Sequence, residues 1–82
     1  MDVRAGLADV KAALLAFGAT APPERSVAFE IDDHVLLLAY DEIDRFTTIA
    51  IGGPRATETA HGLAARFLHA GHEVGDVLPP LR

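Results

Sequence analysis

The sequence predicts an α+β fold in the order α-β-β-β-α: a three-stranded antiparallel meander with both helices on one face. Two observations support this class. Between residues 26 and 51, apolar side chains alternate in short runs that are separated by acidic turns, which is typical of strands. On both sides of that region, apolar residues recur at helical spacing. We therefore expect a single domain over residues 1–82, with helices covering a central sheet.

A first helix is predicted over residues 2–17. Its apolar positions are spaced four and three residues apart, as on one buried stripe: Val3, Leu7, Val10, Leu14 and Phe17. Asp2 would lie at the positive end of the helix dipole, and Gly18 is well placed to end the helix. Leu15 lies off the stripe, so it is either a surface leucine or part of an interface.

Three strands are predicted, over residues 26–31, 34–40 and 45–51. Asp32 and Asp33 would form a two-residue hairpin turn, because aspartate tolerates turn geometry. That turn sets Ile31 against His34, Phe29 against Leu36 and Val27 against Leu38. Residues 41–44 would form a four-residue loop, which sets Tyr40 against Arg45, Leu38 against Thr47 and Leu36 against Ile49.

This register gives the sheet two apolar faces. The face expected to pack on helices carries Val27, Phe29, Ile31, Leu36, Leu38, Tyr40, Ile49 and Ile51. The second face carries Ala28, Glu30, Val35, Leu37, Ala39, Phe46, Thr48 and Ala50. A sheet with one face in water normally has a polar second face. A register slip of one residue would exchange the faces without removing the problem, because the middle strand is apolar on both.

The second face is therefore the predicted interface. Exposed apolar patches usually mark a contact with another molecule. The candidate residues are Val35, Leu37, Ala39, Phe46 and Thr48. The alternative is that the C-terminal tail, residues 72–82, folds back over the patch. That tail could instead add a short edge strand to the sheet.

A second helix is predicted over residues 54–70. Pro54 is favoured at a first helical position because its missing N–H is not needed there, and Gly71 is the natural stop. The broad apolar side of this helix consists of Ala56, Ala60, Leu63, Ala64, Phe67 and Leu68. Gly62 lies within it and should cost about 1 kcal/mol relative to alanine.

The order of elements over residues 2–70 resembles that of the double-stranded RNA-binding domain. In that family the second helix begins with clustered lysines that hold phosphates. The matching stretch here, residues 53–59, has one cation and one anion, Arg55 and Glu58. The resemblance therefore concerns the fold, and no nucleic-acid partner is predicted. Bacterial secretion chaperones of the dimeric α/β kind have a similar order of elements in a longer chain.

Composition excludes several classes of function. The net charge of −5 disfavours phosphate backbones, and the absence of cysteine rules out disulfide and thiolate chemistry. No apolar run approaches the ~20 residues that span a bilayer, and residues 1–4 lack the layout of a signal peptide. We expect a cytoplasmic protein with no membrane partner, no cofactor and no metal. No nucleophile elbow or phosphate loop is present, so we do not expect an enzyme.

Carboxylates form an acidic rim at both ends of the middle strand, consisting of Asp32, Asp33, Asp41, Glu42 and Asp44. The two groups would lie about 20 Å apart, too far for a shared acid–base pair. They are either solvated turns or a rim that steers a basic partner. His34, beside the first group, is either a plain turn histidine or half of a pH-sensitive pair with those aspartates.

The leading hypothesis is a small non-enzymatic protein–protein interaction module, adaptor-like or chaperone-like. It would form a homodimer or dock a protein partner through the second face of its sheet. One alternative is an immunity- or inhibitor-type protein whose acidic turns cap a basic partner. Another is a small metal- or ligand-binding subunit that uses His61, His69, His72 and Glu73, although H-x-x-H-E is not a zinc signature.

Overall fold

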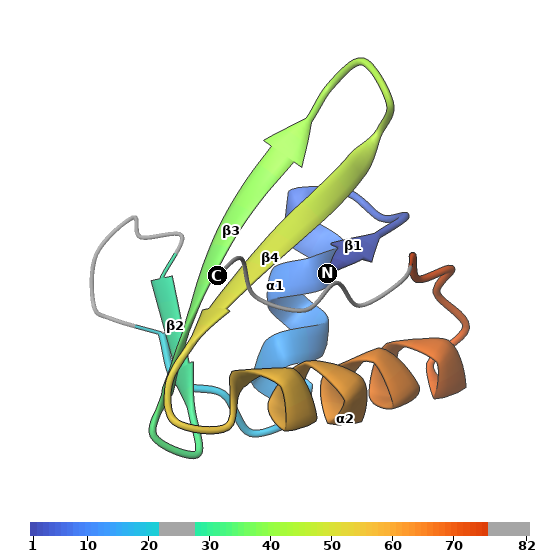
Figure 1. The fold of residues 1–82 in the computed structure, drawn as a ribbon. Helices are drawn as coiled ribbons and strands as arrows, with labels where there is room; N and C mark the ends of the chain where they lie inside the picture. The colour runs from blue at the N-terminus through green and yellow to red at the C-terminus, as the bar shows by residue number, and fades with distance from the viewer. Residues whose placement is uncertain (22–27, 76–82) are drawn as a thin grey trace.

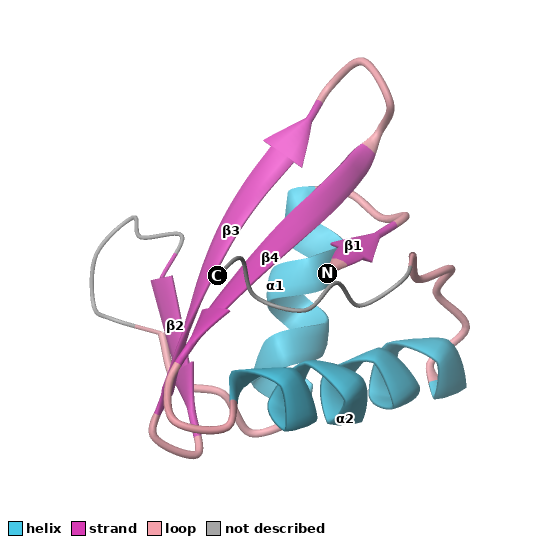
Figure 2. Ribbon diagram, in the orientation of Figure 1, coloured by secondary structure: helices cyan, strands magenta, loops and turns pink. Residues whose placement is uncertain are grey.

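The computed structural model describes residues 1–21 and 28–75. Within them the chain forms β1 (Asp2–Val3), α1 (Leu7–Ala16), β2 (Ala28–Ile31), β3 (His34–Asp41), β4 (Phe46–Gly52) and α2 (Ala56–His69). The described strands make one antiparallel sheet in the order β1-β4-β3-β2 (Figures 1 and 2). The predicted α+β class with an antiparallel sheet is confirmed. The three-stranded sheet is wrong, because β1 adds a fourth strand beside β4.

The predicted helix over residues 2–17 is wrong at its start. Asp2 and Val3 pair with Thr48 and Thr47 on β4, and the backbone N–H of Ile49 donates to the carbonyl of Met1 at 2.7 Å. The open edge of β4 thus offers the first residues backbone hydrogen bonds that a helix terminus could not provide. Val3 is fully buried on β1, and a helical stripe also predicts it to be buried, so the apolar spacing did not distinguish the two.

The β2–β3 hairpin forms with the predicted register. Ile31 pairs with His34, and Phe29 pairs with Leu36. Asp32 and Asp33 have φ of 47° and 65°, so both central residues are left-handed, as in a type I′ turn. The predicted partner of Leu38 on this side, residue 27, and the start of the predicted strand at residue 26 lie outside the described residues.

The predicted β3–β4 register is wrong by two residues. Leu38 pairs with Ile49 and Tyr40 with Thr47, so the loop covers residues 42–45. Asp41 stays in the strand, and its Oδ1 accepts hydrogen bonds from the backbone N–H groups of Ile43 (2.8 Å) and Asp44 (3.1 Å). This cap moves the loop one residue along the chain. Since the shift is even, every side chain keeps its predicted face.

Helix α2 begins two residues later than predicted. Pro54 is not in the first turn, and Arg55 has the non-helical dihedrals φ −129° and ψ 48°. The reason lies in the preceding turn, where Gly53 takes φ 149° and passes directly over the ring of His34. A side-chain Cβ at Gly53 would lie 2.4 Å from that ring. The chain therefore clears His34 before it can turn into the helix.

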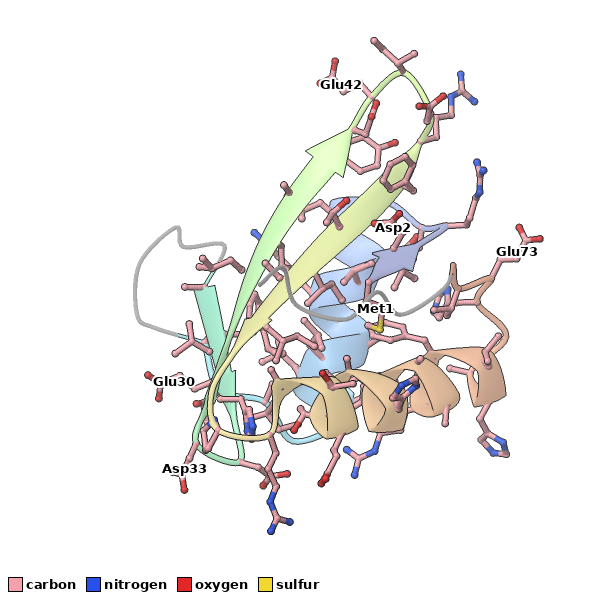
Figure 3. All side chains as sticks on the ribbon, in the orientation of Figure 1. Met1, Asp2, Glu30, Asp33, Glu42 and Glu73 are labelled. Carbon is pink, nitrogen blue, oxygen red and sulfur yellow. The ribbon has the colours of Figure 1, made fainter. Side chains whose placement is uncertain are left out.

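The core lies between the helices and one face of the sheet. Both helices supply buried side chains to it, and alternate strand residues complete it. Its buried members are Val3, Val10, Leu14, Ala19, Phe29, Ile31, Leu36, Leu38, Ile49, Leu63 and Phe67. We call this side of the sheet the inner face. Figure 3 shows the side chains on the ribbon.

The described part of the C-terminal segment lies beside β1. The backbone N–H of Arg4 donates to the carbonyl of Glu73, and that of Gly75 donates to Asp2, both at 2.8 Å. Within the described residues, the possible C-terminal edge strand is thus limited to one bridge, between Val3 and Val74. The remainder of the predicted tail, residues 76–82, lies outside the described residues. Neither helix in this part of the chain is long and apolar enough to cross a bilayer.

Candidate interface on the outer face of the sheet

The strand register places a second set of side chains on the side of the sheet opposite the helices, which we call the outer face. Its members are Asp2 from β1, Ala28 and Glu30 from β2, Val35, Leu37, Ala39 and Asp41 from β3, and Phe46, Thr48 and Ala50 from β4. The residues proposed from the sequence as an interface all lie within this set. The alternation of strand side chains brings them together.

Exposure differs sharply between neighbours on β3. Val35 and Leu37 are 43% and 51% exposed, whereas Leu36 and Leu38 are 0% and 4% exposed. Phe46 and Thr48 on β4 are half-buried, and Ala39 and Ala50 are exposed. The centre of the outer face is therefore an exposed apolar strip in which Leu37 stands opposite Ala50.

The charged side chains on this face are all acidic. None of the described strands contains lysine or arginine, while Asp2, Glu30 and Asp41 project from the outer face. Asp2 accepts a hydrogen bond from the hydroxyl of Thr48 at 3.0 Å. The apolar strip is thus bordered by carboxylates on both flanking strands and at the end of β3.

The acidic rim predicted from the sequence lies at the two ends of β3, and the structure does not bring its halves together. Asp32 and Asp33 form the β2–β3 turn, and Asp41, Glu42 and Asp44 belong to the β3–β4 loop or its base. Cations lie near both halves. Beside the first half, Arg55 bonds the His34 ring through its backbone N–H, and Arg66 lines a hollow with Asp32. Beside the second half are Arg45 within the loop, and Arg4, whose Nη1 donates to the carbonyl of Asp44 at 3.1 Å.

Sequence reasoning missed Ile43, which is 91% exposed at the tip of the β3–β4 loop. This hairpin extends beyond the helices (Figure 1). A shallow depression connects the loop with the end of the outer face, and its lining consists of Ala39, Tyr40, Asp41, Glu42, Ile43, Phe46 and Thr48. The only sequence signal for this exposed residue was one isoleucine among four charged residues. It lies in a loop whose conformation is stabilised by hydrogen bonds to the side chain of Asp41.

His34 lies on the inner face, where it is 6% exposed. The backbone N–H of Arg55 donates to its Nε2 at 3.3 Å, and the hydroxyl of Thr59 lies 3.2 Å from the same atom. Because Nε2 accepts, the ring proton lies on Nδ1 and is donated to the carbonyl oxygen of Asp32 at 2.7 Å. The ring therefore bonds the main chain of the turn rather than an aspartate carboxylate. Its visible role is to join the turn to α2.

The histidines suggested for a metal site do not converge. Within residues 1–21 and 28–75, no three histidine, cysteine or carboxylate side chains lie close enough to hold an ion. His61 and His69 are exposed, and the ring of His72 packs edge-on against Phe67 with centroids 5.8 Å apart. The described residues thus give this alternative no constellation of ligands.

Large exposed apolar side chains also occur on the helices. Leu15 on α1 and Leu68 on α2 are 53% and 58% exposed. Each lies on a helix, away from the outer face, so neither extends the apolar strip.

Comparisons with protein family models, with curated proteins and with solved structures each found no match.

Proposed function

We propose that this protein is a non-enzymatic interaction module that docks a protein through the outer face of its sheet. The observation that carries the proposal is the exposure of Val35 and Leu37 in the middle of the sheet, beside residues of the same apolar character. Burying apolar surface against a partner contributes about 25 cal/mol per Å². Apolar side chains do not stabilise a sheet face that stays in water, so their presence here favours a partner that covers them.

The shape and charge of this face favour a protein over other ligands. The strip is a broad surface of strand side chains with a hollow at each end, one beside Ala28, Glu30 and Val35 and one at the β3–β4 loop. A surface of that breadth suits a protein, whereas small-molecule sites are usually single concave cavities. Phosphate-bearing partners favour lysine and arginine, which the described strands lack. A second copy of the chain and a different protein both satisfy this proposal.

The direct test is a pair of matched substitutions, Leu37→Ser on the outer face and Leu68→Ser on α2. Both side chains are similarly exposed, at 51% and 58%, so both changes should leave the fold intact. Each variant and the wild type would be measured by light scattering across concentration and used as bait for partner capture. We expect Leu37→Ser to abolish association and Leu68→Ser to retain it.

The opposite pattern would contradict the proposal. Association that survives Leu37→Ser and is lost with Leu68→Ser would place the contact on the helices. A wild type that stays monomeric and captures the same proteins as Leu37→Ser would remove the docking role from the outer face. Thermal unfolding of all three proteins checks that they are equally folded.

A further inference from the structure

We infer that the partner of the outer face is a protein surface with an apolar centre bordered by lysine or arginine, and not a second copy of this chain. The inference rests on the proposed function and adds the chemistry of the partner. Three features of the described residues carry it: the size of the apolar strip, the sign of its border and the position of the nearby cations.

The apolar strip is too small to form a stable interface alone. With strands about 4.8 Å apart and about 3.4 Å per residue, the β2–β3–β4 part of the outer face covers roughly 350 Å². Stable interfaces bury about 800 Å² on each partner. A partner that binds here therefore extends past the strip and contacts its border. The border residues then decide which partners are accepted.

The border disfavours a second copy. Glu30, Asp32 and Asp33 lie at the turn end of β3, while Asp41 and Glu42 lie at its loop end. Carboxylates outnumber the cations Arg4 and Arg45 along this border, so two outer faces placed against each other bring together two surfaces of the same net sign. Like charges placed opposite each other in an interface suppress binding, and opposite charges select the partner.

The cations near this face do not supply the missing positive charge. Arg4 donates to the carbonyl of Asp44 beside the loop, and Arg45 occupies the last loop position, with φ 57°. Both lie at the loop end, beside β1 and β4. Near the turn end, Arg55 and Arg66 lie on the α2 side of the sheet, and Arg55 pairs with Glu58 at 3.7 Å. The described strand and turn residues at that end carry carboxylates and no lysine or arginine. A complementary partner would present its basic side chains to that end.

A charge-reversed copy of this chain is a defined probe of that chemistry. Glu30→Lys with Glu42→Lys gives the same apolar strip a basic residue at each end, at two exposed positions. The matched control, Asp9→Lys with Glu73→Lys, makes the same change in net charge at two exposed positions outside the strip and its border. Sedimentation and titration calorimetry would measure wild type alone and wild type mixed with each variant.

We expect wild type to bind the charge-reversed copy at least about tenfold more tightly than it binds itself or the control variant. Raising salt from about 0.1 M to about 1 M should weaken this complex, since the Debye length falls from about 10 Å to about 3 Å. Leu37→Ser in the wild-type partner should abolish the complex, because the apolar centre is required as well as the border.

Several results would overturn the inference. Wild type that self-associates through Leu37 as tightly as it binds the charge-reversed copy would identify a second copy as the partner and leave the proposed docking role standing. Equal binding to the control variant would show that net charge, not the border, controls association. Absence of any complex would also overturn it, while the comparison of Leu37→Ser with Leu68→Ser decides the docking role separately.

Discussion

The inner and outer faces of the sheet carry the same kinds of apolar side chain, but they differ in what covers those side chains. Leu36 and Leu38 on the inner face are covered by the helices, whereas Val35 and Leu37 between them remain open. Strand β3 is thus apolar on both sides. Within the described residues, only its inner side is covered. The difference teaches that apolar composition does not reveal which side of a strand is core. Only the position of the helices decides it.

The polar residues differ between the faces as well. On the inner face, His34 and Thr47 are buried, and each makes hydrogen bonds; the hydroxyl of Thr47 donates to the carbonyl of Ala5 at 2.8 Å. On the outer face, Glu30 is exposed to water. Buried polar groups need partners within the chain, while exposed carboxylates are free to meet another molecule.

The strongest test of this comparison is Leu36→Ala against Leu37→Ala. Leu36→Ala should reduce the free energy of unfolding by about 3 kcal/mol, because it removes fully buried methyl groups and leaves a cavity. Leu37→Ala should change it by less than about 1 kcal/mol, since half of that side chain is already in water. Urea unfolding measures both. Equal losses would contradict the assignment of the faces.

The second-largest loss of stability is expected from a substitution at Gly53, beside the turn end of the inner face. Gly53→Ala should destabilise by about 2 kcal/mol, because φ is 149° and the new Cβ would meet the His34 ring at 2.4 Å. Gly52→Ala is the matched control, since no atom lies within 4 Å of its added Cβ.

A double-mutant cycle separates the two causes of this loss. In a His34→Ala background the ring is gone, so Gly53→Ala should cost less than it does in the wild type. The backbone strain at φ 149° remains in both backgrounds. Identical costs in the two backgrounds would mean that the close approach of the His34 ring has no energetic consequence.

A smaller, stabilising effect is expected at the turn shared by both faces. Asp32→Asn with Asp33→Gly installs the preferred type I′ pair at φ 47° and 65°, and should stabilise by about 1 kcal/mol. The same change removes two rim carboxylates, so it should weaken the complex with the charge-reversed copy. A thermal melt and the titration would record opposite changes. Loss of stability would contradict the turn assignment.

The smallest effect is expected on α2, behind the inner face. Gly62 lies inside the helix, and no atom lies within 4 Å of an added Cβ. Gly62→Ala should therefore stabilise by about 0.5–1 kcal/mol through helix propensity alone. Thermal unfolding measures the gain. A loss would mean that the hollow beside Gly62, which Thr59 and Leu63 also line, needs the glycine.

Much of the fold could be predicted because local patterns determine it. The alternation of side chains predicted β3 and its two faces, and the Asp32–Asp33 pair predicted the first hairpin with its register. The start of the chain could not be predicted, since Val3 fits a helical stripe as well as the edge of β4. That choice depends on an open strand edge that forms 44 or more residues later.

The candidate site was predictable in its position and not in its details. Leu37 and Ala39 share a face because they are two residues apart on one strand, and Phe46 and Thr48 stay on that face in any register shifted by an even number of residues. The loop was displaced because the Asp41 side chain caps it, and this depends on where the strand ends. Ile43 was missed because an apolar residue in a short loop has no periodicity. The role of His34 required knowing that Gly53 passes over its ring.

The methyl groups of β3 test the central claim most directly, because neighbouring leucines report on opposite faces. Methyl NMR spectra of wild type would be recorded across dilution and during titration with the charge-reversed copy. A docking role for the outer face predicts shifts of the Val35 and Leu37 methyl groups while those of Leu36, Leu38 and Leu68 stay in place. Shifts confined to Leu15 or Leu68, or spectra that never change, would contradict it.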